Sequence, residues 1–112
     1  MSNTLYSAAL TAFAKGEIVW KASGGSTVKA VIVDTANYTF SDAHTNLSQV
    51  PAAARVGSPV ALTLVDAANG GVCDAADITF TGLTNAPTVE AIVLYKDTGT
   101  ENTSTLIAYI DK

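Results

Sequence analysis

Charged side chains are scarce in this sequence. Lys, Arg, Asp and Glu together make up 14% of the 112 residues, against roughly 25% in an ordinary soluble domain. Six basic residues, among which Arg55 is the sole arginine, stand against ten acidic ones, so the formal net charge is −4. Proteins that bind nucleic acid need clustered positive charge. Because the chain has no basic run, we expect no nucleic-acid partner.

Cysteine and histidine occur once each, as Cys73 and His44. One cysteine cannot form an intrachain disulfide, and one cysteine with one histidine is a poor start for a zinc site. The sequence predicts that Cys73 is a small buried or half-buried thiol at the start of a strand. His44 lies in the hydrophilic stretch 41–45, which predicts a solvated side chain.

Patterns typical of catalysis are also missing. No Gly-x-Ser-x-Gly motif is present. Asp74 and Asp77 are three positions apart, and this spacing places side chains on opposite faces of a strand. The segment Gly24-Gly25-Ser26-Thr27 lacks the Lys-Ser/Thr pair of a phosphate-binding loop, so it predicts a turn. We therefore expect that the protein is not an enzyme, with no catalytic, cofactor-binding or metal-binding residue and no cofactor.

Long apolar runs are absent as well. The longest extend over five residues, Ala91 to Tyr95 and Leu106 to Ile110, whereas a membrane-spanning helix needs about 20. We expect no membrane partner. The first residues lack the basic patch and the apolar stretch of a secretory signal, which favours an intracellular origin.

What the chain does contain is enough apolar material, 48% of its residues, for the core of one domain covering residues 1–112. Residues 4–15 predict a helix, because Tyr6, Leu10 and Phe13 recur at helical spacing and Gly16 provides a stop signal.

Short β-branched runs separated by turn residues occupy the rest of the chain. The predicted strands are 17–21, 27–33, 59–65, 72–81, 89–96 and 105–111. Pro59 would be the first residue of its strand, residues 68–71 would form a hairpin turn, residues 38–40 a short extended piece, and residues 42–49 a loop or one helical turn. Six or seven strands at this spacing predict a mainly β fold, an antiparallel β-sandwich (jelly-roll-like) with one short N-terminal helix.

Three of these strands are apolar on both faces, at residues 30–33, 91–95 and 106–110. A strand with one solvated face would alternate apolar and polar residues, and one helix covers only part of a sheet face. We therefore expect self-association, as a homodimer or a homotrimer, or packing in a larger assembly. Trp20, the sole tryptophan, predicts core packing.

Several segments form a series that covers most of the chain. They are Asn3–Tyr6 before the Ala-rich helix, Gly16–Trp20, Val28–Thr35 followed by Tyr38–Thr39, Val50–Val56, Asp74–Phe80, Glu90–Gly99 and Leu106–Asp111. In this order they resemble a family of small tailed-bacteriophage virion structural proteins, similar to head decoration or cement proteins.

The resemblance implies a capsid decoration or cement protein with a β-sandwich fold, which clamps subunits of the major capsid protein and stabilises the head. The implied partners are the major capsid protein and further copies of the chain. The implied location is the capsid surface of the virion, after synthesis in the cytoplasm of the bacterial host. Two alternatives remain open, namely a tail or fibre-associated structural or receptor-binding module, and a small enzyme or ligand-binding domain.

Overall fold

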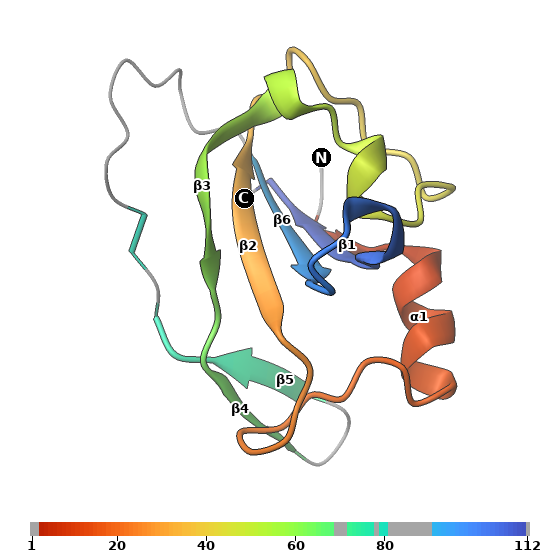
Figure 1. Cartoon of the computed structure of the whole chain (residues 1–112), viewed down its shortest axis with the longest axis vertical. Coiled ribbons are helices and arrows are strands. Elements are labelled where there is room, and N and C mark those ends of the chain that lie inside the picture. Colours follow the sequence, from red (N-terminus) through yellow and green to blue (C-terminus); the bar gives the residue numbers. More distant parts are fainter. Residues whose placement is uncertain (1–2, 69–71, 78, 81–90, 112) are drawn as a thin grey trace.

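Two antiparallel sheets and one α-helix make up the part of the chain that is described in this computed structural model, residues 3–68, 72–77, 79–80 and 91–111 (Figure 1). The five-stranded sheet has the order β1-β7-β6-β2-β3, and β4 pairs with β5 in a separate hairpin. The elements are β1 (Thr4–Leu5), α1 (Ser7–Ala14), β2 (Val28–Val33), β3 (Arg55–Ala61), β4 (Leu64–Ala68), β5 (Val72–Ala75), β6 (Ala91–Lys96) and β7 (Leu106–Ile110), with short 3₁₀ turns η1 (Leu47–Gln49), η2 (Ala52–Ala54) and η3 (Glu101–Thr103). The mainly β, sandwich-like fold with one N-terminal helix is confirmed.

The five-stranded sheet is covered on both faces, which explains why its central strands are apolar throughout. In β6, Ala91, Val93 and Tyr95 are buried on one face, while Ile92 and Leu94 on the other face are half-buried. In β2 the paired residues share these faces, whereas the β6–β7 pairing shifts register between Leu94 and Tyr95, so that Ile107 and Ala108 of β7 both lie in the second cluster. Each face therefore belongs to its own apolar cluster.

The first cluster lies between the sheet and the segment 34–54. From that segment Tyr38, Leu47 and Val50 pack on Val93 and its neighbours. The second cluster lies on the opposite face, under α1 and the β4–β5 hairpin. Its members are Ala9, Ala12, Ile18, Val28, Leu64, Ile107 and Ala108, with Phe13, Trp20, Leu62, Ala75, Leu94 and Ile110 packed around them.

The helix is shorter than the predicted 4–15, because the chain first pairs with the sheet. Thr4 and Leu5 form β1 against Tyr109 and Ala108 of β7. Tyr6 keeps extended backbone angles, with φ −76° and ψ 143°, and α1 begins after it. The predicted helix was correct in its core and wrong in its first residues.

The predicted strand 17–21 is wrong, and the end of α1 shows why. Gly16 adopts φ 75°, a left-handed conformation typical of helix C-termini. The N–H groups of Glu17 and Ile18 then donate to the carbonyl of Ala12, at 2.8 and 3.3 Å. Because these donors close the helix, they do not pair with a strand, although Ile18 is buried.

The predicted strand 59–65 proves to be parts of two strands. Pro59 lies inside β3, not at its start, and the chain leaves the sheet before β4. The pairing of β2 with β3 shifts register between Ala30 and Ile32, and Gly57 has φ 70°. Within the described residues β3 is an edge strand, where a missing N–H and a bulge are tolerated.

The remaining predicted elements differ mainly in length. Strands 27–33 and 105–111 are confirmed as β2 and β7, and the helical turn expected within 42–49 is η1. The strand predicted at 72–81 is limited to β5, since residues 76, 77, 79 and 80 are not strand. Residues 38–40 carry no strand either. Residues 69–71, 78, 81 and 89–90 of the predicted turn and strands lie outside the described residues.

Candidate functional site

An open apolar cavity of about 660 Å³ lies on the second face of the sheet, between α1 and the β4–β5 hairpin. It is lined by Leu5, Leu10, Phe13, Trp20, Cys73, Leu94, Ile107 and Ala108. A second hollow shares three of these residues and extends toward Asn3, Thr4 and Ile110. We call the two together the apolar groove. No Lys, Arg, Asp, Glu or His is among the lining residues.

The short helix forms one wall of the groove because of how its residues are distributed. Ala9 and Ala12 are buried against the sheet, where small side chains permit close approach. Leu10 and Phe13, three positions apart, lie on the groove side. Leu10 is 55% exposed and Leu5 of β1 is 46% exposed, so large apolar side chains meet solvent at the mouth of the groove.

The loop after α1 closes the opposite end and is held by directed contacts. The indole N–H of Trp20 donates to the backbone carbonyl of Asp74 in β5 at 2.8 Å. The backbone N–H of Ala22 donates to the carboxylate of Asp66 in β4 at 2.8 Å. Trp20 is half-buried and packs against the second cluster, so the prediction of core packing holds only in part.

Cys73 is the single reactive side chain in the groove, and its surroundings do not activate it. The thiol lies in β5 and is exposed, contrary to the buried or half-buried side chain that was predicted. Partial desolvation raises the pKa of the Cys73 thiol, whereas nucleophilic cysteines have lowered values. The groove therefore offers contact area and no reactive chemistry.

The acidic residues and turns elsewhere in the described chain are placed as follows. Within the described residues no three His, Cys, Asp or Glu side chains come together as a metal site. The same part of the chain has no helix with the length and apolar character needed to cross a membrane. Asp74 and Asp77 are both exposed, and only Asp74 lies in a strand. The turn lies slightly earlier than the predicted 24–27, at residues 22–24, and residues 25–27 have no regular structure, although the Ser26 N–H donates to the Val19 carbonyl at 2.8 Å.

Nothing among protein-family models, curated proteins or solved structures matches this chain.

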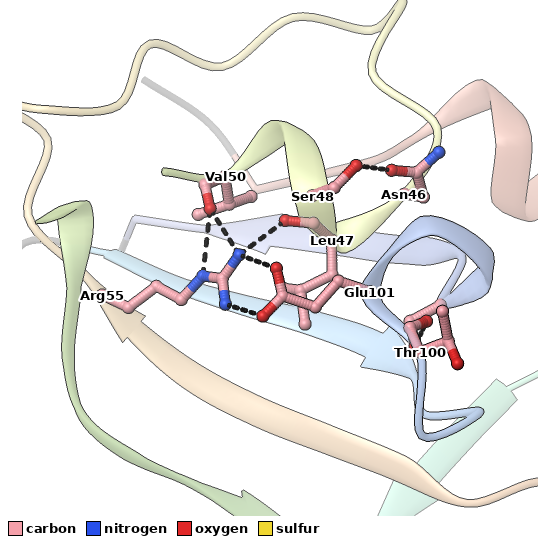
Figure 2. A network of polar contacts seen from close by, with 8 residues as sticks. Asn46, Leu47, Ser48, Val50, Arg55, Thr100 and Glu101 are labelled. Carbon is pink, nitrogen blue, oxygen red and sulfur yellow. Dashed lines mark hydrogen bonds and ion pairs between the residues drawn. The ribbon is translucent and has the colours of Figure 1, made fainter. Parts of the chain in front are cut away.

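Two polar arrangements escaped prediction from the sequence. In the first, shown in Figure 2, Arg55 at the start of β3 forms a two-pronged ion pair with Glu101, with Nη1 to Oε2 at 2.8 Å and Nη2 to Oε1 at 2.9 Å. The same guanidinium donates to the carbonyl of Leu47 at 2.9 Å and twice to that of Val50, at 3.0 and 2.7 Å. Arg55 thus joins β3, η1 and η3.

The second arrangement corrects the prediction for His44. This side chain is half-buried, not solvated, and its Nδ1 atom lies 2.8 Å from the hydroxyl of Tyr38. The Tyr38 hydroxyl also lies 2.8 Å from that of Tyr6, which is fully buried. The three residues are 6 and 32 positions apart along the chain, so no local spacing reveals their contact.

Proposed function

We propose that this protein is a structural subunit of a tailed-phage virion, a capsid decoration protein that clamps neighbouring copies of the major capsid protein. The observation that supports the proposal is the apolar groove, with Leu5 and Leu10 open to solvent at its mouth. Large exposed apolar surfaces in soluble proteins generally mark interaction sites. The sequence resemblance supplies the kind of partner.

The groove suits a clamp because clamping requires contact area and no catalysis. Fully burying an exposed leucine side chain contributes about 1.5–3 kcal/mol, and Leu10, which is 55% exposed, would gain about half of this on binding. Many copies on one lattice add avidity, and a subunit that binds only the assembled shell stabilises it by mass action. Because the lining carries no charge, binding should change little with moderate salt, which screens only exposed charges.

The decisive experiment compares heads depleted of this protein with heads to which purified variants are added back. We expect the wild type to raise the temperature at which heads break. Leu10→Gln should bind about fivefold to tenfold more weakly, because it removes one apolar contact. Val65→Thr is the matched control, since Val65 is 46% exposed on β4 and is not among the residues lining the groove. This variant should bind like the wild type.

Two outcomes would contradict the proposal. Tailless heads that lack the protein, while tails contain it, would place it in a tail or fibre. Equal binding by Leu10→Gln and wild type would show that the groove is not the contact. Self-association is part of the same proposal, and sedimentation of the pure protein should show a dimer or trimer.

A further inference from the structure

Three side chains form a row of hydrogen bonds that links the residue before α1 to the segment 38–44. Tyr6 is fully buried, Tyr38 is 4% exposed, and His44 is half-buried at the outer end. The two contacts, Tyr6 hydroxyl to Tyr38 hydroxyl and Tyr38 hydroxyl to His44 Nδ1, both measure 2.8 Å. The rings also pack, with 5.4 Å between the centroids of Tyr38 and His44.

The direction of these hydrogen bonds follows from counting hydrogens. With neutral His44 protonated only at Nε2, the Tyr38 hydroxyl donates to Nδ1 and the Tyr6 hydroxyl donates to Tyr38. Both phenolic hydrogens then have an acceptor. Burial is the largest cause that raises the pKa of Tyr6 and of Tyr38, so both hydroxyls keep their hydrogens at physiological pH.

Protonation of His44 breaks this balance. Nδ1 then carries a hydrogen, so three hydrogens share two contacts, and one of them has no acceptor within the row. Leaving a buried donor without an acceptor is unfavourable. We propose that the Tyr6–Tyr38–His44 row is an acid-sensitive latch, which holds the N-terminal segment against residues 38–44 while His44 is neutral and loosens its hold when His44 is protonated.

The latch acts on α1 because its inner residue immediately precedes the helix. Tyr6 also anchors the chain to β7, through its N–H to the Ile107 carbonyl at 3.0 Å. The next residue, Ser7, donates from its N–H and its hydroxyl to the Asp42 carboxylate, at 2.9 and 2.5 Å. The start of α1 is therefore tied to the 38–44 segment twice. Since α1 is one wall of the apolar groove, loosening the latch would alter the groove.

The charged and titratable groups around His44 come from the row itself and from the neighbouring segment. The row itself contributes Tyr38 and Tyr6, and Tyr109 packs on Tyr38 with 6.2 Å between ring centroids. Asp42, two residues before His44, is engaged with Ser7. Within the described residues no carboxylate forms an ion pair with His44. It is the only histidine in the chain, and carboxylates as a class titrate at lower pH.

The first test is the tautomer of His44, read from the ¹⁵N shifts of the imidazole at pH 7.5. A single histidine makes the assignment unambiguous. We expect the hydrogen on Nε2, with Nδ1 as acceptor. A hydrogen on Nδ1 at this pH would overturn the proposal, because the row would then already lack an acceptor for one hydroxyl.

The second test compares wild type with His44→Asn in chemical unfolding between pH 7.5 and 5. Asn places a carbonyl oxygen near the position of Nδ1 and does not titrate in this range. We expect the unfolding equilibrium constant of the wild type to rise on acidification, by no more than about thirtyfold, which is the limit that one histidine can contribute over this pH range. The constant of His44→Asn should stay nearly the same. Parallel profiles for the two proteins would refute the latch.

Hydrogen exchange of the wild type keeps the test independent of any variant's folding. At pH 5.5, after correction for intrinsic rates, the α1 amides should lose protection by a larger factor than those of β2 and β6. Equal factors in helix and sheet would show that acid acts on the whole fold and not on the latch. None of these three measurements involves the phage head, so failure here leaves the proposed function unaffected.

Discussion

Replacing Arg55 with alanine should destabilise the fold strongly, and the reason is a pair of backbone carbonyls. The Arg55 side chain is only 16% exposed, and its guanidinium provides five hydrogen bonds (Figure 2). Three of them go to the carbonyls of Val50 and Leu47. The Leu47 carbonyl also accepts a hydrogen bond from the Val50 N–H at 2.9 Å. Loss of Arg55 therefore affects the Val50 carbonyl more than the Leu47 carbonyl.

The magnitude follows from these contacts. A hydrogen bond from a charged donor contributes about 1.5–3 kcal/mol, and the contributions within one network are not additive. Losing the bonds to two carbonyls should therefore cost about 3 kcal/mol of unfolding free energy. For a domain of this size, about 4 °C of Tm corresponds to 1 kcal/mol, so the Tm should fall by about 12 °C.

Two further variants separate the carbonyl bonds from the ion pair. Glu101 is 56% exposed, and exposed ion pairs contribute little, so Glu101→Gln should shift the Tm far less than Arg55→Ala. Arg55→Lys keeps the charge but not the planar fork, and it should fall between them. Thermal unfolding followed by circular dichroism measures all three. An Arg55→Ala loss below about 4 °C, or one no larger than that of Glu101→Gln, would refute the reasoning.

Two other substitutions test the surrounding structure. Gly25→Ala should cost about 3 kcal/mol of unfolding free energy, because an added Cβ would lie 2.3 Å from the backbone carbonyl oxygen of Lys21. At Gly16 an added Cβ would meet nothing within 4 Å, so Gly16→Ala should cost only the left-handed strain of about 1 kcal/mol. Equal losses in urea denaturation would contradict this. The hydrogen bond from Lys29 lowers the pKa of Asp97, so its stabilisation is present above the ordinary aspartate pKa of about 4 and is lost as pH falls through the lower folded value. Asp97→Asn should flatten that acid limb in unfolding experiments from pH 5 to 2, and an unchanged limb would exclude the pair as its source.

The central strands could be predicted because each one is a continuous apolar run in the sequence. Continuous apolar runs such as 30–33 and 106–110 are typical of strands covered on both faces. Prediction failed where contacts between distant residues decide the local structure. The run from Ile18 to Trp20 is β-branched and apolar like a strand, yet donors at its start close α1, and Trp20 bonds to β5.

The sequence could predict that an apolar surface remains beside the helix, but not which residues form the apolar groove. The sequence predicted that α1 covers part of a sheet face, and the half-buried Leu94 and Ile110 agree with this. Which residues form the mouth depends on β1, whose two residues pair with a strand more than 100 positions later. A two-residue strand leaves no periodic pattern, so the exposed position of Leu5 could not be read from the sequence.

The two edges of the five-stranded sheet limit how copies of this chain can join. One described edge is β1, with room for two residues of pairing, and the other is β3, with a shifted register and Pro59, which has no N–H to offer. Edges of this kind discourage edge-to-edge pairing of sheets into open-ended filaments. Copies kept at high local concentration would consequently meet through side-chain faces, where association stops once the apolar surface is covered. An arrangement of this type favours closed contacts of fixed number over polymerisation.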